Sequence, residues 1–468
     1  MRPGVFLRRA ARAGKIRGND SVTKEMTHGS PMKLILGFSI PLFFGNIFQQ
    51  FYSMVDTIIV GRVLGTGPLA AVGSTGSVTF LIVGFCLGLC SGFAIPVAQR
   101  FGSRDYEELR RFIGNAVWLC AGFGTVLTVL TVVFCRDILE LMGTPADIID
   151  DAYAYLVIIF AGIPATFLYN ILSGIQRALG DSRTPVVFLV IASIINIVLD
   201  IVLIVFVPLG VAGAAIATVV SQLVSGLGCL IYASRHYEVL RMTRDNFKLR
   251  APYVRRLLGM GLPMALQTSI TAIGSVILQA SVNSLGSVAV ASVTAGSKLY
   301  MFFACAYDAM GVTMSTYSGQ NIGARKIDRI GQGVKACSIV GIVYSVLALA
   351  VIFFLGGWLL LLFVDAGETA IIDAAYQYLL TSGLFMIPLT FVNVLRLTVQ
   401  GMGYSRIAMF AGVFEMVARG VVGAVFVPIF GFAAACFAGP VAWIMADIFL
   451  FPAYFYVMRR VRQGEGVY

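Results

Sequence analysis

The sequence predicts an all-α polytopic membrane protein, in which twelve transmembrane helices form two parallel-repeat six-helix bundles around a central cleft. Three observations support this fold class: the composition, the number and length of the apolar runs, and an internal duplication. The 468-residue chain is 58% hydrophobic and only 12% charged. A water-soluble protein of this length could not bury so much apolar surface.

The apolar runs are each near the length of about 20 residues that crosses the hydrocarbon layer as a helix. We expect twelve membrane spans, at 33–62, 67–95, 110–135, 148–175, 184–206, 211–232, 257–284, 287–316, 332–362, 370–396, 405–427 and 430–457.

The basic residues indicate how these spans are oriented. The formal net charge is +11, but nearly all Lys and Arg lie in the two tails and in the even-numbered connections between spans. Cytoplasmic connections attract Lys and Arg, so we expect both termini in the cytoplasm. The placement also excludes nucleic acid as a partner, although basic loops can touch anionic lipid headgroups non-specifically.

The sequence shows neither the pattern of a signal peptide nor that of a metal site. Residues 1–30 are polar and basic without an apolar segment, so we expect a disordered cytoplasmic tail. Met26 and Met32 both precede the first span, so either could be the true translation start. The eight cysteines lie in or beside apolar runs without a CxxC pair, and the chain has only two His. We therefore expect the cysteines to pack as small apolar residues.

An internal duplication divides the chain into two halves. Gln99-x-x-Gly-x-Arg104 recurs as Gln320-x-x-Gly-x-Arg325, and four further anchors recur in the same order at nearly the same offset. Because each half has an even number of spans, both halves enter the membrane in the same orientation, with a path between them. The expected organisation is a tail at 1–30, a first lobe at 31–232, a cytoplasmic linker at 233–256, a second lobe at 257–457 and a cytoplasmic tail at 458–468.

The fifth span contains the first candidates for a functional site. Asn196 and Asp200 are four residues apart and therefore lie on one face of a helix. An ionisable group within the membrane costs about 3 kcal/mol by insertion scales and normally faces a cavity or a partner. The amide and carboxylate oxygens could form half of a site for a small cation or a proton. The alternative is a buried Asp that neighbouring helices satisfy.

Other charges within the spans differ between the two halves. At the duplication offset, Asn196 and Asp200 fall on Glu415 and Arg419, which we expect to form a structural ion pair on one helix face. Asp56 falls on Leu278, so the carboxylates of the first half have no unpaired counterpart. We therefore expect the cation or proton site in the first half.

Lys298 lies deep in its span and needs either a carboxylate partner or surroundings that favour its neutral form. Asp308, Glu415 and Asp447 are the candidates. We expect Lys298, Asp308, Glu415, Arg419 and Asp447 to form an intramembrane charge network.

Several segments resemble the multidrug and toxic compound extrusion (MATE) transporters. They are Val55-Asp-Thr-Ile-Ile-Val-Gly61 after Pro41, Gly174-Ile-Gln-Arg-Ala-Leu-Gly-Asp181, Asn196-Ile-Val-Leu-Asp200 and Gly210-Val-x-Gly-Ala-Ala-Ile-Ala-Thr218, within a resemblance that covers 31–455. In that family, a pocket between the first, fifth and sixth helices binds Na⁺ or H⁺. The resemblance assigns this role to Asp56, Asn196, Asp200 and Thr218.

The resemblance does not extend to a second cation site. Some relatives have carboxylates in the seventh and tenth helices, where this chain has Gln279, Asn283, Asn393 and Arg396.

The resemblance implies a secondary active antiporter and not an enzyme. Such a protein exports amphipathic, often cationic organic compounds, such as drugs and toxic metabolites, in exchange for Na⁺ or H⁺. Aromatic faces attract organic cations and Met side chains adapt to varied shapes. Candidates for the substrate cleft, each of which could instead face lipid or the core, are Phe48, Tyr52, Met54, Tyr300, Met301 and Met310.

Two alternatives remain open. A lipid-linked oligosaccharide flippase of similar architecture would need several cationic groups in its cavity. An integral membrane enzyme would need a His cluster, a nucleophile elbow or a phosphate loop, and the sequence has none of these.

We expect no cofactor other than Na⁺ or H⁺ as coupling ion, no metal beyond Na⁺, and no nucleic acid partner. The partners would be small organic substrates and the lipid bilayer. We further expect a monomer with both termini cytoplasmic in the plasma (inner) membrane of a bacterium.

Cysteine labelling tests the expected orientation. In a background without the eight native cysteines, a cysteine introduced at Asp147 should react with an impermeant maleimide in whole cells, because 147–151 is expected outside. A cysteine at Ser234 should react only after the cells are permeabilised. Labelling at 234 but not at 147 in whole cells would reverse the orientation.

Overall fold

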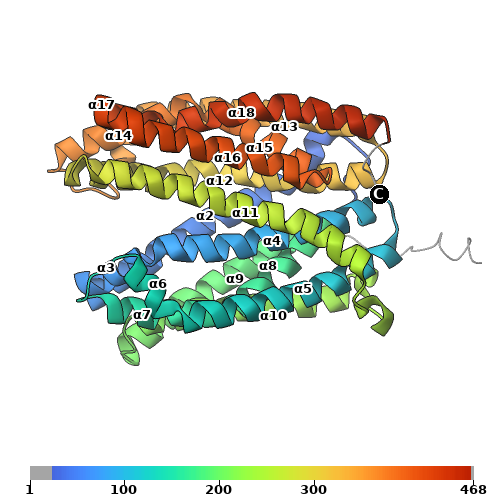
Figure 1. Cartoon of the computed structure of the whole chain (residues 1–468), viewed down its shortest axis with the longest axis horizontal. Coiled ribbons are helices and arrows are strands. Elements are labelled where there is room, and N and C mark those ends of the chain that lie inside the picture. Colours follow the sequence, from blue (N-terminus) through green and yellow to red (C-terminus); the bar gives the residue numbers. More distant parts are fainter. Residues whose placement is uncertain (1–23, 465–468) are drawn as a thin grey trace, which may run out of the picture.

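The computed structural model describes residues 24–464, which are almost entirely helical and contain no β-strand. Ten helices are long and apolar enough to cross a membrane, and there are up to twelve such spans if each of two bent helix pairs counts as one. The helices run along one axis in two layers (Figure 1). The all-α polytopic fold predicted from the sequence is confirmed.

We call the helices before residue 237 the first lobe and those after residue 250 the second lobe. The first lobe contains α2 (Pro31–Leu64), α3 (Thr66–Ser74), α4 (Gly76–Gly102), α5 (Tyr106–Val133), α6 (Cys135–Leu141), α7 (Ile149–Ala161), α8 (Ile163–Ala178), α9 (Arg183–Asp200), the π-helical η1 (Ile201–Phe206) and α10 (Val211–His236). Two short 3₁₀ turns, η2 (Glu238–Leu240) and η3 (Arg244–Phe247), lie in the connection to the second lobe.

The second lobe repeats this order of elements. It contains α11 (Ala251–Asn283), α12 (Ser287–Gly323), α13 (Ile327–Leu360), α14 (Thr369–Leu384), α15 (Met386–Gly401), α16 (Ser405–Val421), the π-helical η4 (Val422–Phe426), α17 (Val427–Phe430) and α18 (Phe432–Arg462).

The duplication is visible in the irregularities of the helices. The α7–α8 pair bends by 46° and the α14–α15 pair by 53°. Pro164 and Pro388 lie directly after these two breaks, in the first turn of the following helix, where a missing N–H leaves no hydrogen bond unmade. The π-helical segments η1 and η4 also occupy equivalent places. Such segments often lie at functional sites, and η1 begins directly after Asp200.

The first helix of each lobe crosses from one lobe to the other. Leu34, Ile35 and Phe38 of α2 are buried in the hydrophobic core of the second lobe, whereas Leu257 and Ala265 of α11 belong to the core of the first. Figure 1 shows both helices running diagonally between the two layers. A shape change at the lobe interface must therefore move or bend α2 and α11.

We call the end of the bundle that carries residues 24–30, 103–105 and 237–250 the basic end, and the opposite end the far end. In the half nearest the basic end the lobes approach at backbone distance. A Cβ atom on Gly88 of α4 would lie 2.6 Å from Cα of Ala265. Gly92 meets Gly261 in the same way, and Gly102 meets the carbonyl oxygen of Gln320. Because no side chain separates the helices here, the lobes are closed against each other at the basic end.

The N-terminal residues nearest the bundle differ from the expected disordered tail. Met26 is only 1% exposed, its N–H donates to Oε1 of Gln320 at 2.8 Å, and its carbonyl accepts from Asn321. Glu25 accepts two hydrogen bonds from Arg104 of the first lobe at 3.0 and 3.1 Å. The prediction for 24–30 is therefore wrong, because this segment is packed against both lobes. The rest of the expected tail, 1–23, lies outside the described residues.

The C-terminal boundary also differs slightly from the expectation. The last helix, α18, continues to Arg462, into the predicted tail at 458–468. Residues 465–468 lie outside the described part.

Substitution of Gly88 tests the close packing of the lobes. The Ala side chain of Gly88→Ala would overlap the backbone of α11, so we expect a loss of about 1–3 kcal/mol of stability and a lower melting temperature in detergent. Gly259→Ala is the matched control at the same interface region, because a Cβ there meets no atom within 4 Å. Equal melting temperatures for both variants would show that the lobes do not pack this closely.

Candidate functional site

The structure brings together the four residues that the MATE resemblance assigns to cation binding. Asp56 comes from α2, Asn196 and Asp200 from α9, and Thr218 from α10. Nδ2 of Asn196 lies 3.5 Å from Oγ1 of Thr218, to which it donates, and the carboxyl groups of Asp56 and Asp200 are close enough to interact. The site lies where α9 passes into η1.

The oxygens of this site are buried without donors. Among residues 24–464, no hydrogen-bond partner is found for either carboxylate oxygen of Asp200, for Oδ1 of Asp56, or for Oδ1 of Asn196. Asp200 is 0% exposed. A buried carboxylate without a partner is costly, so the arrangement favours a bound cation or proton. Carboxylate, amide and hydroxyl oxygens are the ligands that hard cations such as Na⁺ prefer.

A cavity of about 90 Å³ lies beside these oxygens. Asn196 and Thr218 line it together with Gln49, Tyr52 and Ser193. Its volume is enough for about three water molecules, which could complete the shell of a small cation. Tyr52, expected in the substrate cleft, instead lies here, near Asp56 and Asp200 and hydrogen-bonded to Gln49.

Sequence reasoning missed Tyr155 as a neighbour of the carboxylates and Gln49 as a residue that lines the cavity. Tyr155 of α7 lies near Asp56 and Asp200, but no motif marks it. Tyr52 had a usable signal, because it precedes Asp56 by four residues and therefore shares its helix face.

Exposed polar side chains lie on α2, α11 and α12 toward the far end of the bundle. A charged side chain that faced lipid at this depth would be costly, so we infer that Lys298 and Asp308 face water between the lobes. The exposed polar residues of α2, α11 and α12 include Gln49, Ser53, Gln279 and Lys298 in this half and Asp308 near the middle of α12.

The residues expected to contact substrate differ in how exposed their side chains are. Phe48 and Met301 are 49% and 51% exposed, and Tyr300 stacks on Trp443 with ring centroids 5.9 Å apart. Met54 is half-buried on α2. The hypothesis for Met310 is wrong in this conformation, because Met310 is 3% exposed within the core of the second lobe.

The duplicated glutamine motif closes the basic end symmetrically. Nε2 of Gln99 donates to the carbonyl of Gly401 in the second lobe at 3.0 Å. Nε2 of Gln320 donates to the carbonyl of Ala178 in the first lobe at 2.9 Å. Each copy of the motif thus bonds the opposite lobe at an equivalent position.

The family model MatE matches this chain twice, over residues 41–202 and 263–425. The chain belongs to the MatE family. It is therefore a MATE transporter, a multi-pass membrane protein and not an enzyme. The two matched segments coincide with the two copies of the duplication.

Relatives of this transporter come from several bacteria. The probable multidrug resistance protein YoeA of Bacillus subtilis (strain 168) is 29% identical over 74% of this chain and 77% of its own length. The FAD transporter of Shewanella oneidensis is 27% identical over 64% of this chain and 68% of its own. DNA damage-inducible protein F of Escherichia coli (strain K12) is 26% identical over 68% and 70%.

Solved structures share the fold. A MOP superfamily transporter from Pyrococcus furiosus superimposes with a TM-score of 0.88 at 23% identity, covering 94% of this chain and 99% of the other. An outward-facing multidrug resistance MATE transporter gives the same TM-score and identity over 95% and 100%.

The second lobe of this MATE transporter contains a cluster of membrane charges around Glu415. The expected contact between Glu415 and Arg419 is present at 3.4 Å, but the closer partner is Arg396 of α15, whose Nη1 donates to Glu415 Oε1 at 2.8 Å. Asp447 lies near Glu415 and Arg396, and Asp308 lies near Arg396. Sequence reasoning missed Arg396 as a partner because nothing in the sequence shows that α15 and α16 face each other here.

Lys298 does not join this network. Its side chain is exposed, and the structure gives it no ion pair with any residue of the described range. The expectation of a carboxylate partner fails because the lysine faces open space, where water can solvate its charge.

Single substitutions test the ranking of the charges in the second lobe. Glu415→Leu removes the carboxylate that two arginines share, so it should destabilise the protein most, by about 3–5 kcal/mol. Arg396→Leu should cost more than Arg419→Leu, because its contact is shorter. Melting temperatures in detergent measure the order, and a larger loss for Arg419→Leu than for Arg396→Leu would contradict it.

Proposed function

We propose that this MATE transporter exports amphipathic, often cationic organic compounds by antiport with Na⁺ or H⁺. The main support is the cluster of buried oxygens on Asp56, Asn196 and Asp200 that have no hydrogen-bond donor within the described residues. We propose that these residues and Thr218 bind the coupling ion. The name of the B. subtilis relative, a probable multidrug resistance protein, supports the substrate class.

Ion binding has a direct route to the lobe interface through α2. The far-end half of this helix carries Asp56, whereas Leu34, Ile35 and Phe38 are anchored in the core of the second lobe. A cation between Asp56 and Asp200 neutralises their mutual repulsion and draws α2 toward α9. Because α2 spans both lobes, this shift strains its contacts with the second lobe. The ion can thus bias the equilibrium between two lobe arrangements by its differential affinity for them.

The basic end would face the cytoplasm, since its connections carry the Lys and Arg. In the present shape this end is closed by Gln99 and Gln320. Substrate would enter from the cytoplasm in the alternative shape and leave through the far end. Exposed Asp308 would attract a cation, while Phe48 and Met301 offer apolar contact.

A second candidate substrate is an anionic dinucleotide. The S. oneidensis relative is named an FAD transporter, and Lys298 is an exposed cation on α12. Proteoliposomes with an imposed Na⁺ or pH gradient, offered either ethidium or FAD, distinguish the two. If the gradient drives transport of FAD but not of ethidium, the substrate is an anionic dinucleotide and not an organic cation.

Asp200→Asn tests the proposed ion site. The isostere keeps the volume and loses the charge, so we expect a folded, membrane-inserted protein with at least a tenfold lower rate of gradient-driven efflux. Thr218→Ala should reduce the rate less, because it removes only a neutral ligand. Efflux from proteoliposomes under each gradient measures both.

Asp151→Asn is the control, because Asp151 is an exposed carboxylate at the start of α7, outside the site. It should transport like the unaltered protein. Full efflux by the Asp200→Asn protein under both gradients would refute the site.

A further inference from the structure

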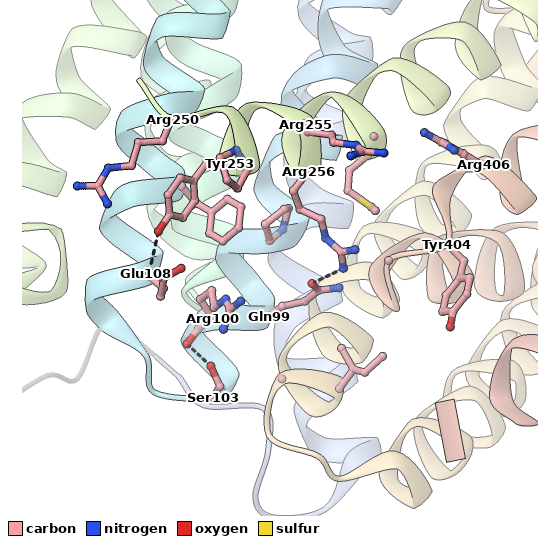
Figure 2. A pocket seen from close by; sticks show the side chains of 18 of the residues that line it. Gln99, Arg100, Ser103, Glu108, Arg250, Tyr253, Arg255, Arg256, Tyr404 and Arg406 are labelled. Atoms are coloured by element: carbon pink, nitrogen blue, oxygen red, sulfur yellow. Dashed lines mark hydrogen bonds between the residues drawn. The ribbon is translucent and has the colours of Figure 1, made fainter. Parts of the chain in front are cut away.

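A cavity of about 1070 Å³ lies at the basic end, between the lobes and apart from the ion site. Figure 2 shows its lining, in which arginines predominate among the charged side chains. Arg100 comes from α4 of the first lobe, Arg255 and Arg256 from α11, and Arg406 from α16 of the second lobe. Arg250, just before α11, completes the set.

The cavity contains more positive charge than its own carboxylates neutralise. Arg250 contacts Asp245 at 3.4 Å, and Arg100 contacts Asp105 at 3.6 Å. Arg255 and Arg406 form no ion pair with any residue between 24 and 464, and Figure 2 shows their guanidinium ends turned toward each other.

The other polar contacts in the cavity do not neutralise its arginines. Within residues 24–464, the side-chain contact that the structure gives for Arg256 is with the amide oxygen of Gln99, at 3.5 Å. Glu108, the acidic residue of the lining, is already bound by Arg111 at 3.0 Å and by the hydroxyl of Tyr253 at 2.8 Å. It is therefore not available to neutralise Arg255, Arg256 and Arg406.

Converging guanidinium groups repel one another unless an anion lies between them. Arginine suits phosphate because its planar donors bind two oxygens at once. Basic pockets between membrane helices at headgroup depth bind anionic lipid headgroups. The apolar side chains of Phe112, Met260 and Ile407 in the same lining would suit the glycerol and first acyl carbons of a lipid.

We propose that this cavity binds a phosphate-bearing anion through Arg255, Arg256 and Arg406, with the headgroup of an anionic phospholipid or a soluble phosphate compound as the source. Arg256 lies near Arg100 of the first lobe, so an anion held by Arg256 lies at the interface of the two lobes. Arg256 also touches Gln99, which bonds Gly401 across the lobe interface. The bound anion therefore stabilises the closed basic end, independently of which ion or substrate the transporter carries.

Binding of a fluorescent short-chain phosphatidylglycerol to the full chain in neutral detergent, at physiological salt, tests this site. Fluorescence anisotropy should show saturable binding, and the ligand should raise the melting temperature by mass action. Arg256→Gln and Arg406→Gln should each weaken binding about fivefold, and the combined change of Arg255, Arg256 and Arg406 to Gln by about 100-fold. Arg244→Gln, at the same end but outside the cavity, should bind like the unaltered protein.

Competition identifies the source of the phosphate. Displacement by unlabelled short-chain phosphatidylglycerol but not by pyrophosphate supports a lipid, and equal displacement by pyrophosphate supports a soluble anion. Displacement by short-chain phosphatidylcholine as effective as by phosphatidylglycerol would overturn the proposal. Unchanged affinity in the combined variant would overturn it too. Arg406→Gln alters an exposed residue and provides the comparison even where the combined variant does not fold.

Discussion

The absence of water inside the bilayer is the constraint on which the rest of this structure depends. Every backbone group must find a partner within its own segment, so the spans are helices. Every charge must find an opposite charge, a bound ion or a water-filled space. Glu415 is paired with two arginines, and Lys298 faces open space where water can solvate it. Asp200 has no opposite charge and no hydrogen-bond donor within the described residues. In this part of the chain both carboxylate oxygens of Asp200 lack a partner, whereas among the buried carboxylate oxygens of the second lobe only Oδ1 of Asp447 does, which supports the proposed ion site in the first lobe.

The crossing of α2 and α11 turns a local charge change into a possible change of shape. If each lobe contained its own six helices alone, an ion in the first lobe would alter only that lobe. Instead, the basic-end half of α2 is part of the second lobe's core, and α11 contributes to the first. The glycines of α4 let α11 approach at backbone distance, so small shifts of the crossing helices change many contacts together.

Sequence patterns predicted those features that local chemistry determines. Apolar run length gave the spans, and a four-residue spacing placed Asn196 and Asp200 on one face. Features that depend on which helices meet were not predictable. Arg396 pairs with Glu415 across two helices, and residues 24–30 are held in place because Met26 packs in the core of the second lobe. In sequence, this polar segment cannot be distinguished from a disordered tail. Its order depends on contacts with Gln320 and Arg104, which are far away in the chain.

The two lobes have diverged in charge although they share a fold. Where the first lobe has Asn196 and Asp200, the second has Glu415 and Arg419 at the equivalent positions, with Arg396 added. A carboxylate that is paired with an arginine does not need to bind an ion. A carboxylate without such a partner binds an ion, so the stability of its conformation depends on the ion's concentration. Under the proposed function the ion therefore acts in the first lobe, and α2 carries its effect to the core of the second lobe, where Leu34, Ile35 and Phe38 are buried.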